Sequence, residues 1–279
     1  MTACSIRAAV TGRPAIDGAG VHLVRVLGPG TIDAFDPFLM LDSFDSTHPA
    51  DYLAGFPLHP HRGIETITYL AAGRIDHKDS LGNEGSIRDG QAQWMCAGSG
   101  IMHEEMPQAS KRMLGVQIWL NLPAAEKMSR PAYHLLDDIV EIEAAHGARV
   151  RVVAGSYGDA AGFAGDHLPA EFFEVLLPAG TVLEVPVKPG HAAHAFLLEG
   201  DAAIAGERFP EKTALAFGDG DSVALAATEA PARILYFSAP RLNEPVAWGG
   251  PVVMNTEAEL AQAFEELRAG TFVHEHPEL

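Results

Sequence analysis

The sequence contains little cysteine, few basic residues and no long hydrophobic run. Cys4 and Cys96 are its only cysteines, which argues against a disulfide scaffold and suits a reducing compartment. The 19 lysine and arginine residues are outnumbered by 37 acidic ones, giving a net charge of −18. Such a surface repels phosphate groups, so we expect no direct binding to nucleic acid or anionic membranes. No apolar run reaches the roughly 20 residues of a membrane helix, and the first residues lack the apolar core of a secretory signal. We therefore expect a cytoplasmic protein.

Short alternating segments indicate an all-β fold. In the segment 115–122, Val116, Ile118 and Leu120 alternate with Gln117 and Trp119. A period of two residues is typical of a half-buried strand. The chain also holds 28 glycines and 19 prolines, which punctuate many such segments with turns. Many short strands separated by turns favour a β-sandwich or β-barrel over alternating strands and helices.

The length of 279 residues favours two domains over one. Two glycines in strand-turn contexts, Gly73 and Gly90, recur as Gly200 and Gly220 at a similar spacing. This weak repeat indicates two copies of one β unit. The polar segment 137–147 is the expected linker between them. We predict an N-terminal domain of residues 1–135 and a C-terminal domain of residues 136–279.

One helix is expected near the C-terminus. Thr256 and Glu259 form a capping-box pattern, and Gly270 is a plausible stop. The apolar positions of the helix follow at spacings of four and three: Leu260, Phe264 and Leu267. We expect residues 257–267 to dock this stripe on a barrel, because so short a helix needs an apolar surface. A weaker helical candidate lies at residues 124–128.

Two pairs of polar residues form the strongest chemical signal. His59 and His61 are separated by one residue, as are His103 and Glu105. On a strand this spacing directs both members of a pair to one face. Two such pairs facing each other would offer three nitrogens and a carboxylate to a metal ion. A site of this kind leaves positions open for water, substrate or oxygen, which suits a catalytic first-row metal better than structural zinc.

Chance and other kinds of site are the alternative explanations for these residues. A single His-x-His pattern among 13 histidines arises by chance as readily as by function, whereas two pairs are harder to attribute to chance. Cys96 has no neighbour that would activate a thiol. Ser99 lacks the spacing of a hydrolase nucleophile, and no phosphate-binding P-loop is present. The remaining histidines considered are expected in loops or at the surface: His77, His134, His146, His167, His274 and His276.

The motif residues resemble those of the pirin family. The string His59-Pro-His-Arg-Gly63 and the later string from Gly98 to Pro107, with its His103-x-Glu105 core, carry the resemblance. It covers most of the chain and is highly specific between His59 and Pro107. Pirins belong to the cupin superfamily. The resemblance therefore implies a bicupin, with two jelly-roll β-barrels packed face to face in one chain and a short C-terminal helix.

The resemblance also implies a ligand set. The family's metal ligands correspond to His59, His61, His103 and Glu105 in this sequence, and its usual metal is Fe(II). Other first-row divalent ions remain open, because affinity follows the metal series more than the protein. General cupins use a further glutamate, which corresponds to Glu65. In pirins this glutamate is not usually a metal ligand, so we expect Glu65 to be structural or to lie behind the ligands.

The second barrel departs from the motif. His191 and His194 stand where the first barrel has His-x-His, but they are three residues apart. On a strand this spacing sends them to opposite faces. No His-x-Glu pair follows Gly220. We therefore expect the C-terminal barrel to be structural and free of metal.

Bacterial pirins resemble quercetinases, which open the central ring of a flavonol with O₂ and release CO. The resemblance implies this activity, with Glu105 as general base. Apolar neighbours in the sequence are expected to line a pocket for the flat substrate: Phe56, Trp94, Met102 and Met106. The alternative is a non-enzymatic, redox-sensing iron protein that contacts a transcription factor or a metabolic enzyme. A barrel with a vestigial metal is a third reading. We expect a monomer.

Overall fold

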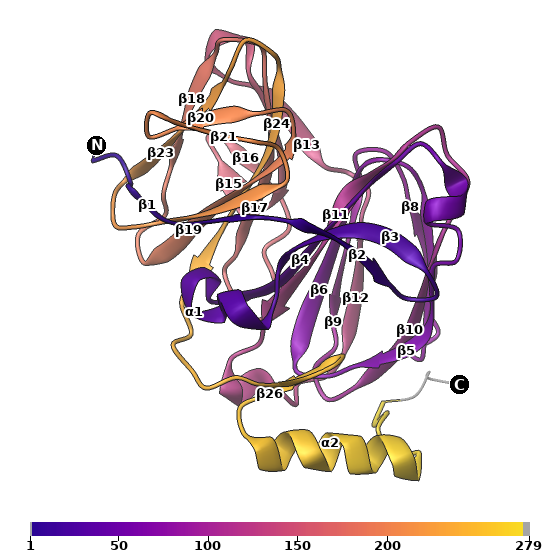
Figure 1. Cartoon of the computed structure of the whole chain (residues 1–279). Coiled ribbons are helices and arrows are strands. Elements are labelled where there is room, and N and C mark those ends of the chain that lie inside the picture. The colour runs from indigo at the N-terminus through magenta and orange to yellow at the C-terminus, as the bar shows by residue number, and fades with distance from the viewer. Residues whose placement is uncertain (1, 276–279) are drawn as a thin grey trace. The chain divides into compact units, whose positions relative to one another are not determined.

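The computed structural model describes residues 2–275, and most of them lie in β-strands (Figure 1). This confirms the all-β class expected from the alternating segments. Between residues 2 and 275, no helix combines the length and the apolar character needed to cross a bilayer.

The described residues form two compact units. We call N barrel the unit made of Pro14–Arg25, Phe38–Asp137 and the residues from Leu242 onward. We call C barrel the unit made of the residues up to Arg13, Val26–Pro37 and Asp138–Arg241. Each unit contains one seven-stranded and one four-stranded sheet among its described residues, which agrees with the repeat seen in the sequence.

The N barrel has a seven-stranded sheet in the order β12-β9-β6-β11-β4-β3-β2 and a four-stranded sheet in the order β5-β10-β7-β8. The strands are β2 Arg13–Asp17, β3 Val21–Leu27, β4 Phe38–Ser46, β5 Phe56–His61, β6 Ile64–Ala72, β7 Ile75–Asp79, β8 Glu84–Ile87, β9 Ala92–Cys96, β10 Ile101–Pro107, β11 Met113–Asn121 and β12 Ala132–Leu136. The C-terminal part adds β25 Ala247–Gly249, β26 Val252–Met254 and α2 Glu257–Ala269.

The C barrel repeats the plan, with sheets in the orders β1-β22-β19-β24-β17-β14-β13 and β18-β23-β20-β21, and a small β15-β16 hairpin. The strands are β1 Ile6–Thr11, β13 Val140–Glu143, β14 Arg149–Ala154, β15 Ser156–Tyr157, β16 Ala160–Ala161, β17 Glu171–Leu177, β18 Val182–Pro186, β19 His191–Glu199, β20 Ala202–Ile204, β21 Glu207–Phe209, β22 Thr213–Phe217, β23 Ser222–Ala227 and β24 Ala232–Pro240. The remaining elements are the short helix α1 Ile32–Phe35 and four 3₁₀ turns, η1 Pro29–Thr31, η2 Pro49–Asp51, η3 Ala124–Glu126 and η4 Ala145–Gly147.

The units do not follow the expected division into residues 1–135 and 136–279, because the chain exchanges its ends. Strand β1 pairs with β22 from Ile6 to Thr11 and so belongs to the C barrel. The C-terminal hairpin and helix belong to the N barrel. The division between Asp137 and Asp138 matches the start of the predicted linker, although that segment also contains strand β13. An edge strand needs a partner for its backbone groups, and such a partner can come from any part of the chain.

Helix α2 has the predicted capping box and stop. Glu259 N–H donates to Thr256 Oγ1, and the Glu259 carboxylate accepts from the Thr256 N–H. Gly270 ends the helix with φ +73°, a conformation that glycine adopts without strain. The apolar stripe of the helix, Leu260, Phe264 and Leu267, packs on the β25-β26 hairpin in one hydrophobic cluster. The predicted docking of the stripe is therefore confirmed, but the surface is this hairpin and not a barrel sheet as expected. Residues 124–128, by contrast, form only the 3₁₀ turn η3.

Candidate metal centre

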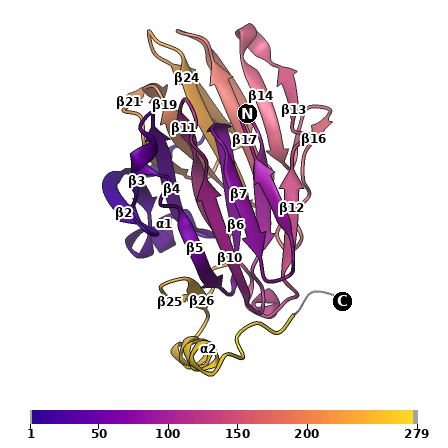
Figure 2. The same ribbon diagram turned by 90° about the vertical axis from the view of Figure 1, so that its right-hand side faces the viewer.

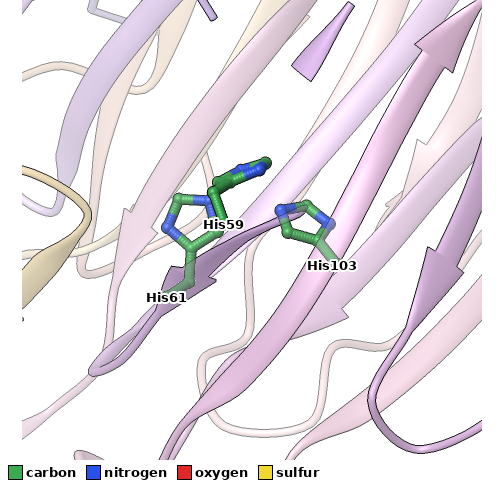
Figure 3. A group of neighbouring side chains, drawn as sticks. All are labelled: His59, His61 and His103. Atoms are coloured by element: carbon green, nitrogen blue, oxygen red, sulfur yellow. The ribbon is translucent and has the colours of Figure 1, made fainter. Parts of the chain in front are cut away.

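Three histidines from two neighbouring strands converge in the N barrel (Figure 3). His59 and His61 lie on β5 and His103 lies on β10, where it is the antiparallel partner of His59. Alternation along each strand directs the three side chains to one face. Their ring nitrogens include one donor atom from each residue, all within 4.8 Å of one another. The structure therefore brings together three of the four predicted ligands.

Hydrogen bonds fix the tautomers of the two β5 histidines. His59 Nδ1 lies 2.9 Å from the carbonyl of Pro57, and His61 Nδ1 lies 3.1 Å from the carbonyl of Pro251. A carbonyl only accepts, so both Nδ1 atoms carry the proton and donate it. In the neutral rings, each Nε2 then presents a lone pair.

The two Nε2 atoms face each other at a distance of 3.1 Å. Two lone pairs at this distance repel unless a metal ion or a proton lies between them. Two nitrogens about 2.1 Å from one metal, at an angle near 95°, are separated by about 3.1 Å. The donor set and its spacing therefore fit a divalent first-row metal.

Burial favours neutral imidazoles in this site. It lowers the pKa of His61 to about 3, with a further contribution from the neighbouring His59. The same effect, with contributions from the surrounding histidines, places the pKa of His103 well below its ordinary value. His103 is 0% exposed, and neither of its ring nitrogens has a hydrogen-bond partner among residues 2–275. A neutral buried imidazole without a partner is available as a metal ligand.

Glu105 lies on β10 on the same face as His103, but its carboxylate is not part of the three-histidine group. The pairing of β10 with β5 shifts register between His103 and Glu105. Glu105 Oε1 accepts from Gln93 Nε2 at 2.6 Å and from Thr68 Oγ1 at 2.9 Å. These bonds hold one carboxylate oxygen on the side of β6 and β9.

A buried polar network continues from Glu105. Thr68 Oγ1 also lies 2.5 Å from Gln117 Oε1, to which it can donate instead of to Glu105. The Tyr133 hydroxyl donates to Gln93 Oε1 at 3.3 Å. Burial, together with Glu105 and Asp79, raises the pKa of Tyr133 to about 12, so the phenol stays protonated. The interior of the barrel thus orients Glu105 from several strands at once.

His77 is a buried neighbour of the site, so the expectation that it lies at the surface is wrong. It is 1% exposed, lies across from Glu105 on β7, and stacks on Tyr133 with centroids 4.3 Å apart. His77 Nε2 lies 3.3 Å from Asp79 Oδ2. Burial would raise the pKa of Asp79, but hydrogen bonds from His77 and Asn83 lower it. The alternation of Ile75, His77 and Asp79 was the available signal for this burial.

The other histidines in that group behave as expected where the structure describes them. They are exposed or half-buried: His134, His146, His167 and His274. His276 lies outside the described residues.

The expected substrate-lining residues are not confirmed. Met102 and Met106 alternate with His103 and Glu105, so they lie on the other face of β10. Trp94 likewise lies on the face of β9 opposite Gln93. Phe56 packs in the barrel core beside Phe44. Neighbours in sequence on a strand point to opposite faces, so adjacency to a site residue does not place Met102, Met106 or Trp94 in the site.

Trp119 is an aromatic residue in contact with one of the three converging histidines. Its ring meets His61 edge-on, with centroids 5.1 Å apart, and lies 5.6 Å from the ring of Trp248. Its position on the same face of β11 as Gln117 could have indicated this role.

Glu65 is fully buried on β6. The side chains of β6 alternate, so Glu65 lies on the face opposite Thr68, which contacts Glu105. Of the two expectations for Glu65, the structural one agrees with this position.

In the C barrel, His191 and His194 do point to opposite faces of β19. His194 is 0% exposed and stacks between Phe35 and Phe237, with centroid distances of 5.3 and 5.4 Å. His191 Nδ1 lies 3.0 Å from Ser238 Oγ. The Ser238 hydroxyl in turn donates to Glu171 at 3.1 Å. The two imidazoles therefore have separate structural partners.

Comparisons with known proteins agree with this architecture. Residues 20–120 match the Pirin family, and residues 172–273 match the family described as the Pirin C-terminal cupin domain. These two matches confirm the bicupin fold. A pirin-like protein of Caulobacter vibrioides is 45% identical over 268 residues, covering 94% of this chain and 97% of the relative.

Two solved structures are also similar. A quercetin 2,3-dioxygenase from Acinetobacter baumannii is 32% identical with a TM-score of 0.88, covering 97% of this chain and 98% of that one. The bacterial pirin YhhW from Escherichia coli, in complex with nickel(II), is 21% identical with a TM-score of 0.65, covering 84% of this chain and 99% of that one. At that identity YhhW supports the fold alone.

Proposed function

The chain belongs to the pirin family, and from this premise we propose that it is a metal-dependent dioxygenase of the quercetin 2,3-dioxygenase type. Its reaction would open the central ring of a flavonol with O₂ and release CO. The observation that carries the proposal is the pair of Nε2 atoms of His59 and His61, 3.1 Å apart, beside His103, whose ring nitrogens have no hydrogen-bond partner among residues 2–275. The similarity to the Acinetobacter baumannii enzyme supports the substrate class.

The resident ion would be one divalent metal, Fe(II) in the first instance, held by His59, His61 and His103 with Glu105 as fourth ligand. When bound, such an ion supplies a Lewis acid that favours loss of a proton from a substrate hydroxyl. The fixed tautomers of His59 and His61 keep both Nε2 atoms available for it, because a ligand's other ring nitrogen sets its orientation.

Glu105 would act as the general base for the flavonol hydroxyl. A base needs a free oxygen to accept a proton, and Oε1 already accepts from Gln93 and lies 2.9 Å from the Thr68 hydroxyl. Oε2 is therefore the atom that we assign to the ligand and base roles. The donors on Oε1 limit rotation of the carboxylate, which keeps Oε2 directed away from β6 and β9.

The test is an aerobic assay of metal-loaded protein with quercetin, following loss of the flavonol absorbance together with CO release. We expect turnover that needs both O₂ and metal, and an anaerobic reaction and metal-free protein serve as controls. Absence of oxygen-dependent turnover with iron, nickel, cobalt and manganese would overturn the enzymatic proposal and favour the regulatory alternative.

A further inference from the structure

The C-terminal part of the chain covers the segment that carries His61. In Figure 2 the β25-β26 hairpin lies between helix α2 and the ends of β5 and β10. Arg62 forms a bridge with Val252, and the Val253 N–H donates to the Arg62 carbonyl at 3.1 Å. These contacts join residues that are about 190 positions apart in sequence, as the His61–Pro251 bond also does.

We propose that residues 247–272, which we call the C-terminal clamp, position His61 and thereby set the metal affinity of the site. The proposal rests on the metal centre assigned above. The contact that positions His61 is made by the backbone carbonyl of Pro251, which accepts a hydrogen bond from His61 Nδ1 at 3.1 Å. The ring therefore keeps its Nε2 lone pair toward His59 only while the hairpin stays in place.

Close backbone packing fixes the hairpin against the ligand strand. Gly63 has φ +77°, and a Cβ placed on it would lie 1.9 Å from the carbonyl oxygen of Val253. The buried Lys127 ammonium donates to the carbonyls of Gly63 at 2.8 Å and Val253 at 3.0 Å, and to the Asn121 side chain. One side chain thus ties both backbones together.

Arg62 anchors the helix of the clamp. Its guanidinium is 2% exposed and lies 2.7 Å from the Glu266 carboxylate. It donates to the Phe272 carbonyl at 2.9 Å and stacks over the Phe272 ring at 4.2 Å. A buried guanidinium needs such partners, because leaving it unpaired is costly. The residue next to His61 is therefore held by the last helix of the described chain.

An aromatic contact adds a second route to the same ligand. Trp248 of β25 packs on Trp119, whose ring meets the edge of His61. Displacement of the hairpin would remove both the carbonyl acceptor and this wall. A ring freed in this way can rotate or change tautomer, and either change removes a nitrogen from the metal.

The experiment uses full-length protein with two variants, Arg62→Met and Glu266→Gln. The matched control is Glu265→Gln, an exposed neighbour on the same helix. Co(II) binding is titrated, and the d–d absorption of the bound Co(II) is recorded. Loss of support behind a ligand weakens metal binding by about 10–100-fold. We expect about tenfold for Arg62→Met, a smaller loss for Glu266→Gln, and an altered absorption band in both. Glu265→Gln should match wild type.

A second measurement needs no metal. In ¹⁵N-labelled metal-free protein, NMR of the histidine rings reports the tautomer of His61, assigned through His61→Asn. We expect the Nδ1–H form in wild type and Glu265→Gln, and a population of the Nε2–H form in Arg62→Met. If Arg62→Met does not fold, Glu266→Gln decides the outcome.

Unchanged Co(II) affinity and absorption in the folded variants would overturn the clamp, as would an Nε2–H tautomer in wild type. A wild-type protein that binds no Co(II) would instead contradict the proposed metal centre, and the NMR result would then decide on the clamp by itself.

Discussion

Among the described residues, the N barrel and the C barrel each combine a seven-stranded and a four-stranded sheet, but they enclose different interiors. The C barrel is filled by apolar side chains such as Val175, Leu215 and Ile234 in one continuous core. The interior of the N barrel holds Thr68, Gln93 and Glu105 in hydrogen-bonded contact.

The C barrel shows that the fold forms around a largely apolar interior. A barrel of this kind is stable with a largely apolar core, because burial of apolar surface is the main stabilising contribution. Buried polar groups are retained where they are hydrogen-bonded and serve a site. The polar network of the N barrel is therefore interpreted as a functional feature.

The largest expected effect is on metal occupancy, which should depend on a histidine of the N barrel but not on one of the C barrel. His61→Ala should reduce metal occupancy to well below wild type, because it removes one of three converging nitrogens. His191→Ala is the matched change in the C barrel and should leave the metal content unaltered. Elemental analysis of both proteins after identical loading provides the measurement. Near-wild-type occupancy in His61→Ala would show that the site has been misplaced.

Glu105→Gln should keep measurable metal, since three histidines remain, yet lose most quercetin turnover. An amide cannot accept the hydroxyl proton, and a general base typically contributes at least about a hundredfold. Turnover should be compared at matched metal content, with Glu104→Gln, on the other face of β10, as control. A Glu105→Gln enzyme nearly as fast as wild type would leave Glu105 no role as a base.

Thr68→Val tests whether the polar interior orients Glu105. The variant keeps the shape of the side chain but removes the hydroxyl that donates to Oε1. A lost hydrogen bond of about 1.4 kcal/mol corresponds to about a tenfold fall in kcat, with metal content unchanged. Thr66→Val, two residues earlier on the same strand, should retain wild-type kcat. Equal values of kcat for the two variants would contradict the orienting role.

The last prediction concerns pH and the stability of the C barrel. Burial, together with Arg241 and Arg7, lowers the pKa of His194 to about 3. A histidine in the unfolded chain has a pKa of about 6.5. Between these values only the unfolded state binds the proton. The free energy of unfolding should therefore fall as pH decreases from about 6.5 toward 3, by up to about 1.4 kcal/mol per pH unit.

His194→Phe should remove this contribution, because phenylalanine does not titrate and can stack between Phe35 and Phe237. Denaturant unfolding of metal-free protein at several pH values measures the slope, and the exposed His48→Gln is the control. A slope equal to that of wild type would show that His194 does not stay neutral in the fold. The pKa of His61 is lowered as well, so the N barrel of this variant should still lose stability in acid.

Local patterns in the sequence predicted much of the molecule. Alternation predicted the strands, and the one-residue spacing placed His59 with His61 on one face. The capping box and the terminal glycine predicted helix α2 and its end at Gly270. Each of these features depends on residues within a few positions of one another, so the backbone geometry of a strand or helix is enough to relate them.

Other features depended on the path of the whole chain. The exchange of β1 and the C-terminal clamp between the units, the Pro251 carbonyl behind His61 and the burial of His77 were not predicted. A strand pattern tells which side chains share a face, but not which strand becomes the neighbour or which face turns inward. Sheet pairing can join residues at any separation along the chain. The sequence by itself therefore determined the histidine pairs, and only the tertiary structure decided what surrounds and orients them.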